Sequence, residues 1–227
     1  MLQIFEIIVL IFSAIIHEYM HGFMADRLGD PTAKQMGRLT LNPIPHIDLF
    51  GSIIMPLLMI FGNFGFVFGW AKPVPFNPYN LRDQRFGPAK VALAGPLGNL
   101  ILALMFGAMA RILPLSSLFK YSILNNYFTL NYNALYGQMS GNFIATLFIL
   151  SVIVCIVNLI LAIFNLVPIP PMDGSRVLAA FLPPKALQAY YSLERYGMFL
   201  ILIFVIFGYQ FISPVVYWLF RLITGLN

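Results

Sequence analysis

One short string in this sequence combines the side chains that hydrolytic metal sites use. It reads His17-Glu18-Tyr19-Met20-His21. On a helix, positions i and i+4 lie on one face and about 6 Å apart along the axis, so the two imidazoles can bind one zinc ion. The glutamate beside the first histidine can take a proton from a metal-bound water, because zinc lowers the pKa of that water to about 7. The string therefore predicts zinc-dependent hydrolysis with Glu18 as general base.

A catalytic zinc ion needs a third protein ligand, and Asp173 is a candidate. It follows an apolar run in the string 165–174, Asn-Leu-Val-Pro-Ile-Pro-Pro-Met-Asp-Gly. An apolar, non-helical segment at membrane depth must be buried in protein or line a cavity, which would let a carboxylate at its end turn inward. The Asp-Gly pair is equally an ordinary turn, and Asp is a common helix N-cap. From the residues alone, both interpretations of Asp173 stay open.

The remaining histidine, His46, is a tempting fourth ligand. Four protein ligands would close the site and leave no position for water, as in structural zinc sites. We therefore expect His46 to order its loop or to be solvated.

The composition is typical of a polytopic membrane protein. Of 227 residues, 60% are hydrophobic and 9% are charged, against roughly 25% charged in an average soluble domain. A small soluble fold cannot hide so much apolar surface, whereas a bilayer can. The net charge of +5 fits basic residues that flank membrane spans and does not argue for nucleic acid. No polar stretch is long enough for a second domain, so residues 1–227 are predicted to form one integral membrane domain.

Five apolar stretches have about the length that a membrane span needs. They are residues 2–25, 49–70, 91–113, 142–167 and 195–223. The predicted fold is therefore all-α with about five transmembrane helices, and with kinks or breaks expected at Gly208 and Pro214. The string 95–99, Gly-Pro-Leu-Gly-Asn, predicts close helix packing near the start of the third stretch.

The metal-binding string lies inside the first of these stretches. An ionisable group at mid-bilayer costs about 2.5–3.5 kcal/mol, so such groups persist where they have a partner or a function. The alternative is that His17, Glu18 and His21 lie at the end of the helix, near the headgroups, and are merely solvated.

The distribution of basic residues predicts the sidedness of the chain. Segments 26–48, 71–90 and 168–194 each carry two or more Lys or Arg residues, whereas 114–141 holds only Lys120 and no acidic residue. The positive-inside rule places the first three segments in the cytoplasm and 114–141 outside, with the active site near the cytoplasmic side. Stretch 49–70, broken by Pro56 and several glycines, would then be re-entrant, although a simple crossing is equally compatible with its length.

A short segment after the first span has the pattern of a strand. Residues 37–41, Gly-Arg-Leu-Thr-Leu, alternate polar and apolar side chains. We expect Met36–Pro43 to form a membrane-associated β-hairpin whose edge binds an extended substrate. The alternative is a plain interfacial loop.

These residues together resemble the site-2 protease family of intramembrane zinc metalloproteases. The resemblance is carried by strings 17–21 and 165–174, is supported by strings 41–48, 69–75 and 94–99, and covers most of residues 10–195. It implies one zinc ion per chain held by His17, His21 and Asp173, with Glu18 as general base. It also implies that Asn165 positions the substrate or stabilises the oxyanion.

The resemblance further implies a multi-pass protein of the cell membrane that cleaves transmembrane proteins or peptides within the lipid bilayer, in regulated intramembrane proteolysis. Two other functions remain. One is a catalytically silent membrane scaffold that binds partners through the same groove. The other is a metal or ion transporter, which would show ionisable residues along several spans or repeated halves. Here these residues cluster at one depth, which favours a single site over a pathway. The sequence reveals neither the substrate nor the oligomeric state.

Overall fold

The computed structural model describes residues 2–62 and 71–226, and this part of the chain forms helices and no strand. In chain order the elements are α1 (Leu2–Arg27), α2 (Thr32–Gln35), the 3-10 turn η1 (Ile44–His46), the π-helical turn η2 (Leu49–Ile54), α3 (Met55–Phe61), η3 (Pro78–Asn80), α4 (Gly87–Ile112), α5 (Ser117–Phe128), α6 (Tyr132–Met139), α7 (Phe143–Asn165), α8 (Asp173–Ala179), α9 (Pro184–Tyr191), η4 (Ser192–Tyr196) and α10 (Gly197–Thr224). The prediction of an all-α fold is confirmed for these residues.

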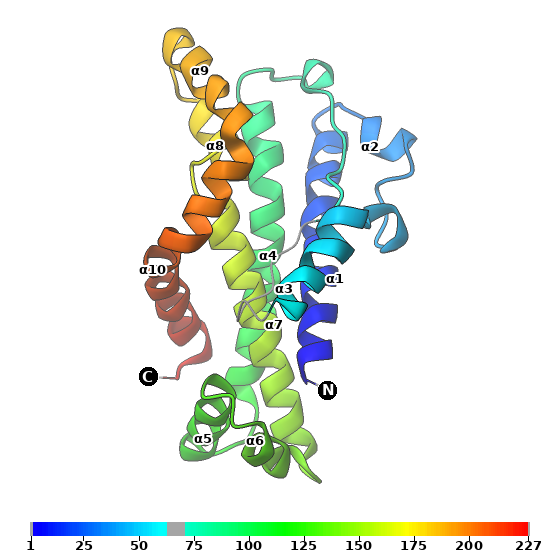
Figure 1. Ribbon diagram of the computed structural model, residues 1–227. Helices are drawn as coiled ribbons and strands as arrows, with labels where there is room; N and C mark the ends of the chain where they lie inside the picture. Colours follow the sequence, from blue (N-terminus) through cyan, green and yellow to red (C-terminus); the bar gives the residue numbers. More distant parts are fainter. Residues whose placement is uncertain (1, 63–70, 227) are drawn as a thin grey trace.

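The centre of the bundle is formed by α1, α4 and α7, and α4 packs against both of the others (Figure 1). The buried face of α4 consists largely of alanine and glycine, including Ala92, Ala103 and Gly107. Small side chains let helix backbones approach closely, which is how helices associate in a membrane. Larger side chains from α7, such as Phe148 and Ile153, fill the core. The close packing predicted for this part of the chain is therefore present.

Four helical stretches in the described residues are long and apolar enough to cross a bilayer. They are α1, α4, α7 and a stretch from Pro184 to Gly208 that runs through α9 and η4 into α10. Helix α10 continues past Gly208 and Pro214 to Thr224, so neither residue breaks it, and the helix bends along its length (Figure 1). An internal proline accounts for such a bend, because it removes one backbone hydrogen bond.

The loop segments that were predicted to share one side of the membrane also lie at one end of the bundle. The segments that contain α2, η3, α8 and α9 all lie at one end of the bundle, and α5 and α6 lie at the other (Figure 1). Three basic segments therefore share one end, and the segment with a single lysine occupies the opposite end. Which end faces the cytoplasm stays a prediction.

The second apolar stretch behaves differently from the four long helices. Its described part, residues 49–62, forms η2 and α3, which at 1.5 Å per residue reach roughly 20 Å and fall short of a hydrocarbon core of about 30 Å. The backbone N–H of Lys72 donates to the carbonyl of His46 over 2.8 Å. The two ends of the stretch therefore lie together, as a re-entrant path requires, and the path itself stays a prediction. Residues 63–70 of the stretch lie outside the described residues.

The predicted β-hairpin at Met36–Pro43 was wrong, because this segment contains turns and no strand. Its polar groups bond elsewhere instead of forming a ladder. The guanidinium of Arg38 donates to the carbonyls of Lys72 and Pro73, at 2.8 and 3.3 Å. The imidazole of His46 donates from Nε2 to the carbonyl of Thr40 over 2.8 Å. The segment is therefore an ordered loop, which was the alternative interpretation.

Candidate metal centre

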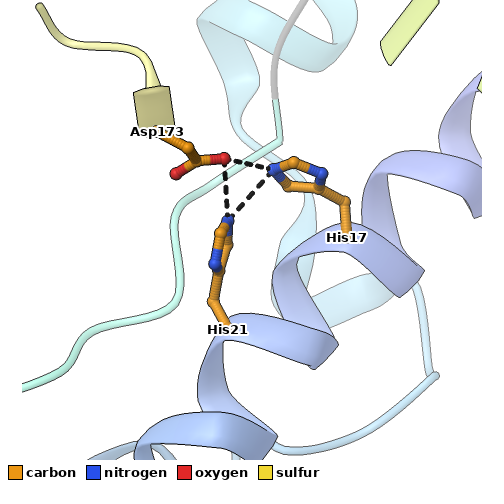
Figure 2. Close-up of side chains that lie close together, drawn as sticks. All are labelled: His17, His21 and Asp173. Atoms are coloured by element: carbon orange, nitrogen blue, oxygen red, sulfur yellow. Dashed lines mark hydrogen bonds and ion pairs between the residues drawn. The ribbon is translucent and has the colours of Figure 1, made fainter. Parts of the chain in front are cut away.

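The three residues predicted to bind metal lie together, although 156 residues separate His17 from Asp173. His17 and His21 project from adjacent turns of α1, and Asp173 projects from the first turn of α8 (Figure 2). The Oδ2 atom of Asp173 lies 3.0 Å from Nε2 of His17 and 3.2 Å from Nε2 of His21. The two Nε2 atoms are 3.0 Å apart. Three potential ligand atoms therefore form a nearly equilateral triangle.

Asp173 reaches this position because of the turn that precedes α8. Helix α7 ends at Asn165, and the prolines at 168, 170 and 171 prevent the helix from continuing. The chain then doubles back, so that a side chain on Gly174 would collide with the backbone carbonyls of Leu166 and Val167. Only glycine permits this approach, and the tight turn carries the carboxylate of the preceding residue to α1.

Helix α4 supplies the wall behind the two imidazoles. A Cβ atom built on Gly95 would lie 2.5 Å from Nε2 of His21 and 2.7 Å from Nε2 of His17. Any side chain at this position would occupy the space between the ligand atoms. The absence of a side chain at Gly95 therefore keeps this space open at a point where α1 and α4 are in contact.

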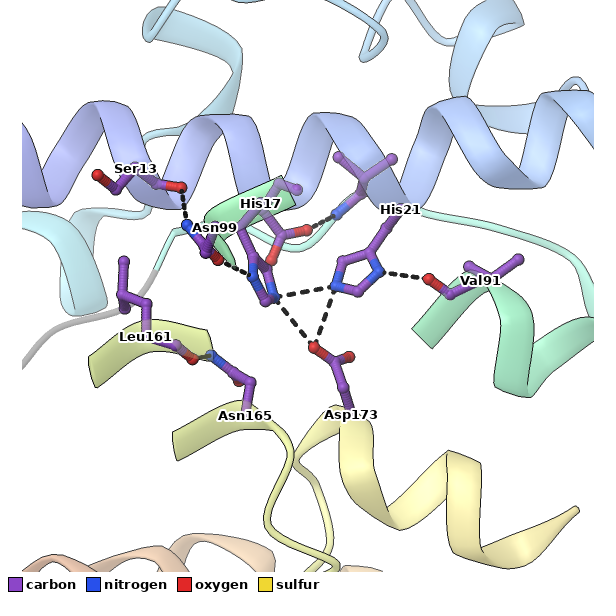
Figure 3. A network of polar contacts seen from close by, with 10 residues as sticks. Ser13, His17, His21, Val91, Asn99, Leu161, Asn165 and Asp173 are labelled. Carbon is purple, nitrogen blue, oxygen red and sulfur yellow. Dashed lines mark hydrogen bonds and ion pairs between the residues drawn. The ribbon is translucent and has the colours of Figure 1, made fainter. Parts of the chain in front are cut away.

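The hydrogen bonds of His17 determine which of its nitrogens is free. Its Nδ1 lies 2.6 Å from Oδ1 of Asn99. The amide nitrogen of Asn99 donates to the backbone carbonyl of Ser13 over 3.2 Å (Figure 3). It also donates to Oδ1 of Asn158 over 2.8 Å. Both hydrogens of that nitrogen are donated to these two acceptors, so the oxygen of Asn99 faces His17 and accepts a hydrogen bond from its Nδ1–H. In a neutral imidazole, this leaves the lone pair on Nε2.

The same logic applies to His21. Its Nδ1 lies 2.8 Å from the backbone carbonyl of Val91, which can only accept a hydrogen bond (Figure 3). Nδ1 of His21 therefore carries the proton, and its Nε2 presents a lone pair. A partner of this kind on the remote ring nitrogen is the usual device that orients a metal-binding histidine.

Two imidazole lone pairs and a carboxylate oxygen thus converge within about 3 Å of one another, and they would repel unless a cation or shared protons lie between them. Ligand atoms of a tetrahedral zinc ion with bonds of about 2.0–2.1 Å are separated by roughly 3.3 Å, close to the distances observed. Two nitrogens and one carboxylate oxygen are also a known ligand set of catalytic zinc. The residues present therefore fit a zinc ion with one open position.

The carboxyl group of Asp173 is held in its charged form. Burial raises the pKa of this group, but where the two imidazoles also carry a proton on Nε2, their hydrogen bonds to Asp173 outweigh burial and hold the pKa well below its usual range. A carboxylate that is ionised at neutral pH is what binding to a metal ion requires.

Glu18 is half-buried on α1 beside this group. Its Oε2 atom accepts a hydrogen bond from the backbone N–H of Val74 over 2.7 Å. It follows His17 directly and precedes His21 by three residues, or about one turn, on the same helix. The structure therefore places the predicted general base next to both candidate ligands, and its role stays a prediction.

Asn165 does not join this hydrogen-bonded group. Its amide nitrogen donates to the carbonyl of Leu161 in its own helix over 2.9 Å, and Figure 3 shows the amide directed at Leu161. A role in substrate positioning would need a different side-chain rotamer, so it stays a prediction. His46 is buried in its loop away from the three potential ligands, where its contact with Thr40 serves to order that loop.

Sequence reasoning missed the polar network behind His17. Asn99 and Asn158 are fully buried, and Asn158 also donates to the hydroxyl of Ser13 over 2.9 Å. Asn99 was assigned to helix packing, and it does link α4 to α1 and α7, but it also orients an imidazole. The available signal was the presence of single asparagines in otherwise apolar spans, because such residues need partners in the bilayer.

Comparison with known proteins relates the chain to metallopeptidases. The model of Peptidase family M50 matches residues 5–206. The chain is 35% identical over 209 residues to "Putative zinc metalloprotease YwhC" of Bacillus subtilis (strain 168), covering 92% of this chain and 80% of that protein. It is 29% identical over 213 residues to "Putative zinc metalloprotease Rip2" of Mycolicibacterium smegmatis, covering 92% and 70% of the two chains. No solved structure matches the chain significantly.

Proposed function

This chain belongs to peptidase family M50, and from that premise we propose that it is a zinc-dependent endopeptidase that hydrolyses peptide bonds of membrane-embedded substrates. The four long apolar helices among its described residues, together with its family, make it a multi-pass membrane protein of a metalloprotease family. The substrate class, the dependence on zinc and the roles of individual residues are what the proposal adds.

The observation that carries the proposal is the convergence of three lone pairs from His17, His21 and Asp173. Three lone pairs that face one another with neither a cation nor a shared proton between them would be unfavourable inside a membrane protein. When bound, a zinc ion supplies a water acidified to a pKa of about 7 and a positive charge beside the scissile carbonyl. The ligand set leaves a position for that water.

Residues of the chain would carry out the proton transfers and orient the substrate. Glu18 would accept the proton of the attacking water and donate it to the nitrogen of the departing amine. The position of Glu18 beside both histidines, on the same helix, supports this role. Asn165 is proposed to orient the substrate or stabilise the oxyanion after a change of rotamer that releases Leu161.

The substrate is proposed to be a transmembrane segment that unwinds locally before cleavage. A helix hides its carbonyls in internal hydrogen bonds, and the hydrocarbon core offers no replacement partners. The candidate centre lies in the half of α1 nearer the end of the bundle that carries α2 and α8 (Figure 1). We propose that this end is cytoplasmic, because three basic segments converge there.

The transporter alternative has little support from the described residues. A pathway would need ionisable or polar side chains at several depths. The buried polar side chains of the other core spans are Asn99 on α4 and Ser151 and Asn158 on α7, and none of these is charged. The two asparagines form one hydrogen-bonded group behind His17 and do not trace a path across the bundle.

One experiment separates the protease from a silent scaffold and from a transporter. Purified protein in detergent is incubated with single-span substrates, with and without a zinc chelator, and compared with Glu18→Gln. We expect cleavage by the wild type, loss of cleavage in Glu18→Gln, and equal zinc content in both. Glu6→Gln, the same change three turns earlier on α1, is the matched control and should still cleave. Zinc binding without any cleavage by the wild type would contradict the proposal.

A further inference from the structure

An extended segment lies across α1 beside Glu18. Residues 71–77, here called the strap, have no helical or strand structure. Its backbone N–H groups bond to three separate elements. Lys72 donates to the carbonyl of His46 over 2.8 Å, Val74 to Oε2 of Glu18 over 2.7 Å, and Asn77 to Oδ2 of Asp30 over 2.6 Å. The strap is therefore fixed at both ends, and its middle contacts the proposed general base.

The sequence of the strap makes the middle contact specific. Val74 stands between Pro73 and Pro75, and proline has no backbone N–H. Among these three residues, Val74 carries the only backbone donor, and that donor is directed at the carboxylate of Glu18. The carbonyl of Pro73 is itself used, because it accepts from Arg38 over 3.3 Å.

Packing keeps the strap close to the helix. Val74 is 7% exposed. A Cβ atom built on Gly22, one turn after Glu18, would lie 2.9 Å from Cγ1 of Val74. The valine side chain thus occupies the space that a side chain at Gly22 would need. The strap therefore lies directly against α1 at this point.

We propose that Val74 is a positioning residue, whose backbone N–H holds one oxygen of the Glu18 carboxylate and so directs the other oxygen toward the reacting water. A glutamate side chain is flexible, and an N–H donor on a charged oxygen forms one of the stronger protein hydrogen bonds. The flanking prolines leave a single donor in this part of the strap, so the carboxylate has one defined orientation. This inference rests on the proposed function, because Glu18 needs an orientation only if it transfers protons.

The hydrogen bond itself can be tested without any activity. In amide hydrogen exchange, the stretch 73–75 reports on Val74 alone, because the two prolines have no exchangeable amide. We expect slow exchange at Val74 in the wild type and exchange at least tenfold faster in Glu18→Ala. Equal exchange rates in the two proteins would show that the carboxylate does not hold this amide, and would overturn the inference whatever the protein cleaves.

The catalytic consequence is tested with Val74→Pro, which removes the N–H and keeps an extended backbone. We expect kcat to fall roughly 10–100-fold, with KM and zinc content unchanged, because a hydrogen bond to a charged group is lost. Val74→Ala retains the N–H, so its kcat should fall less than that of Val74→Pro. Pro75→Ala, which leaves the Val74 donor in place, is the neighbouring control.

If Val74→Pro loses zinc or unfolds, an ester at residue 74 provides the test of the hydrogen bond instead. It is made with the α-hydroxy acid that corresponds to valine, and it replaces only the backbone N–H by an oxygen atom. Unchanged kcat in the ester or proline variant, or an equal loss in Val74→Ala, would overturn the inference. Absence of cleavage by the wild type would instead overturn the proposed function, and the exchange experiment would still report on Val74.

Discussion

Replacing Asn99 should weaken zinc binding although this residue does not touch the metal position. Asn99→Leu keeps a similar size but removes three hydrogen bonds, to Nδ1 of His17, to the carbonyl of Ser13 and to Asn158. Without an acceptor at Nδ1, the imidazole of His17 can adopt the other tautomer or rotate. Its Nε2 would then no longer be held with the lone pair toward Asp173.

The size of the effect follows from these contacts. Loss of a partner that orients a metal-binding histidine costs about 10–100-fold in metal affinity, which is about 1.4–2.7 kcal/mol. The effect on folding is estimated separately. Hydrogen bonds between membrane helices contribute about 0.6 kcal/mol each on average, so three of them amount to about 2 kcal/mol. Zinc affinity and folding stability should therefore fall by comparable free energies.

Asn99→Asp distinguishes orientation of His17 from simple packing. A carboxylate still accepts from Nδ1 of His17, but when ionised it cannot donate to Ser13 or Asn158. We expect zinc affinity within about threefold of the wild type, or higher, together with a loss of stability like that of Asn99→Leu. Zinc affinity is measured by competition with a chromophoric chelator, and stability by unfolding in mixed detergent micelles. Wild-type zinc affinity in Asn99→Leu, or equal weakening in both variants, would refute the reasoning.

Two further predictions concern other parts of the structure. Gly95→Ala should abolish zinc binding while the helical content is retained, because its Cβ would lie 2.5 Å from Nε2 of His21. Metal analysis measures the zinc content and circular dichroism the helical content. Full zinc content in this variant would contradict the prediction. Asp30 is buried, which raises the pKa of its carboxyl, but hydrogen bonds from Thr32, Asn80 and Asn77 outweigh burial and lower the pKa below 3.8. The stability that Asp30 contributes is therefore complete above pH 3.8 and is lost as the pH falls below it. The wild type should exceed Asp30→Asn in stability at pH 6, and this advantage should shrink toward pH 3 in an unfolding titration; a constant difference would count against it.

The parts of the site that depend on local geometry could be predicted from the sequence. The spacing of His17 and His21 places both imidazoles on one face in any helix. The long spans follow from hydropathy alone, and α1, α4 and α7 begin and end within a few residues of the predicted stretches. Asp173 was harder, because no local pattern describes the path of the proline-rich turn, and the resemblance to a known family was needed to select it.

What depends on the rotation of one helix against another could not be predicted. Asn99 could face lipid or a neighbour in an isolated helix, and only the bundle shows that it lies between His17 and Asn158. The hairpin at Met36–Pro43 failed for a related reason. Alternating polar and apolar residues indicate a strand only when the backbone pairs with another strand, and here the side chain of Arg38 draws the loop toward the strap.

X-ray absorption at the zinc edge of the purified protein tests the central claim most directly. The proposed site predicts one zinc ion per chain, bound by nitrogen and oxygen only, at about 2.0–2.1 Å. The spectrum should contain the multiple scattering of two imidazoles, from His17 and His21, and this signal should be lost together with the zinc in Asp173→Ala. A sulfur ligand at about 2.3 Å, or a spectrum without imidazole scattering, would contradict the proposed site.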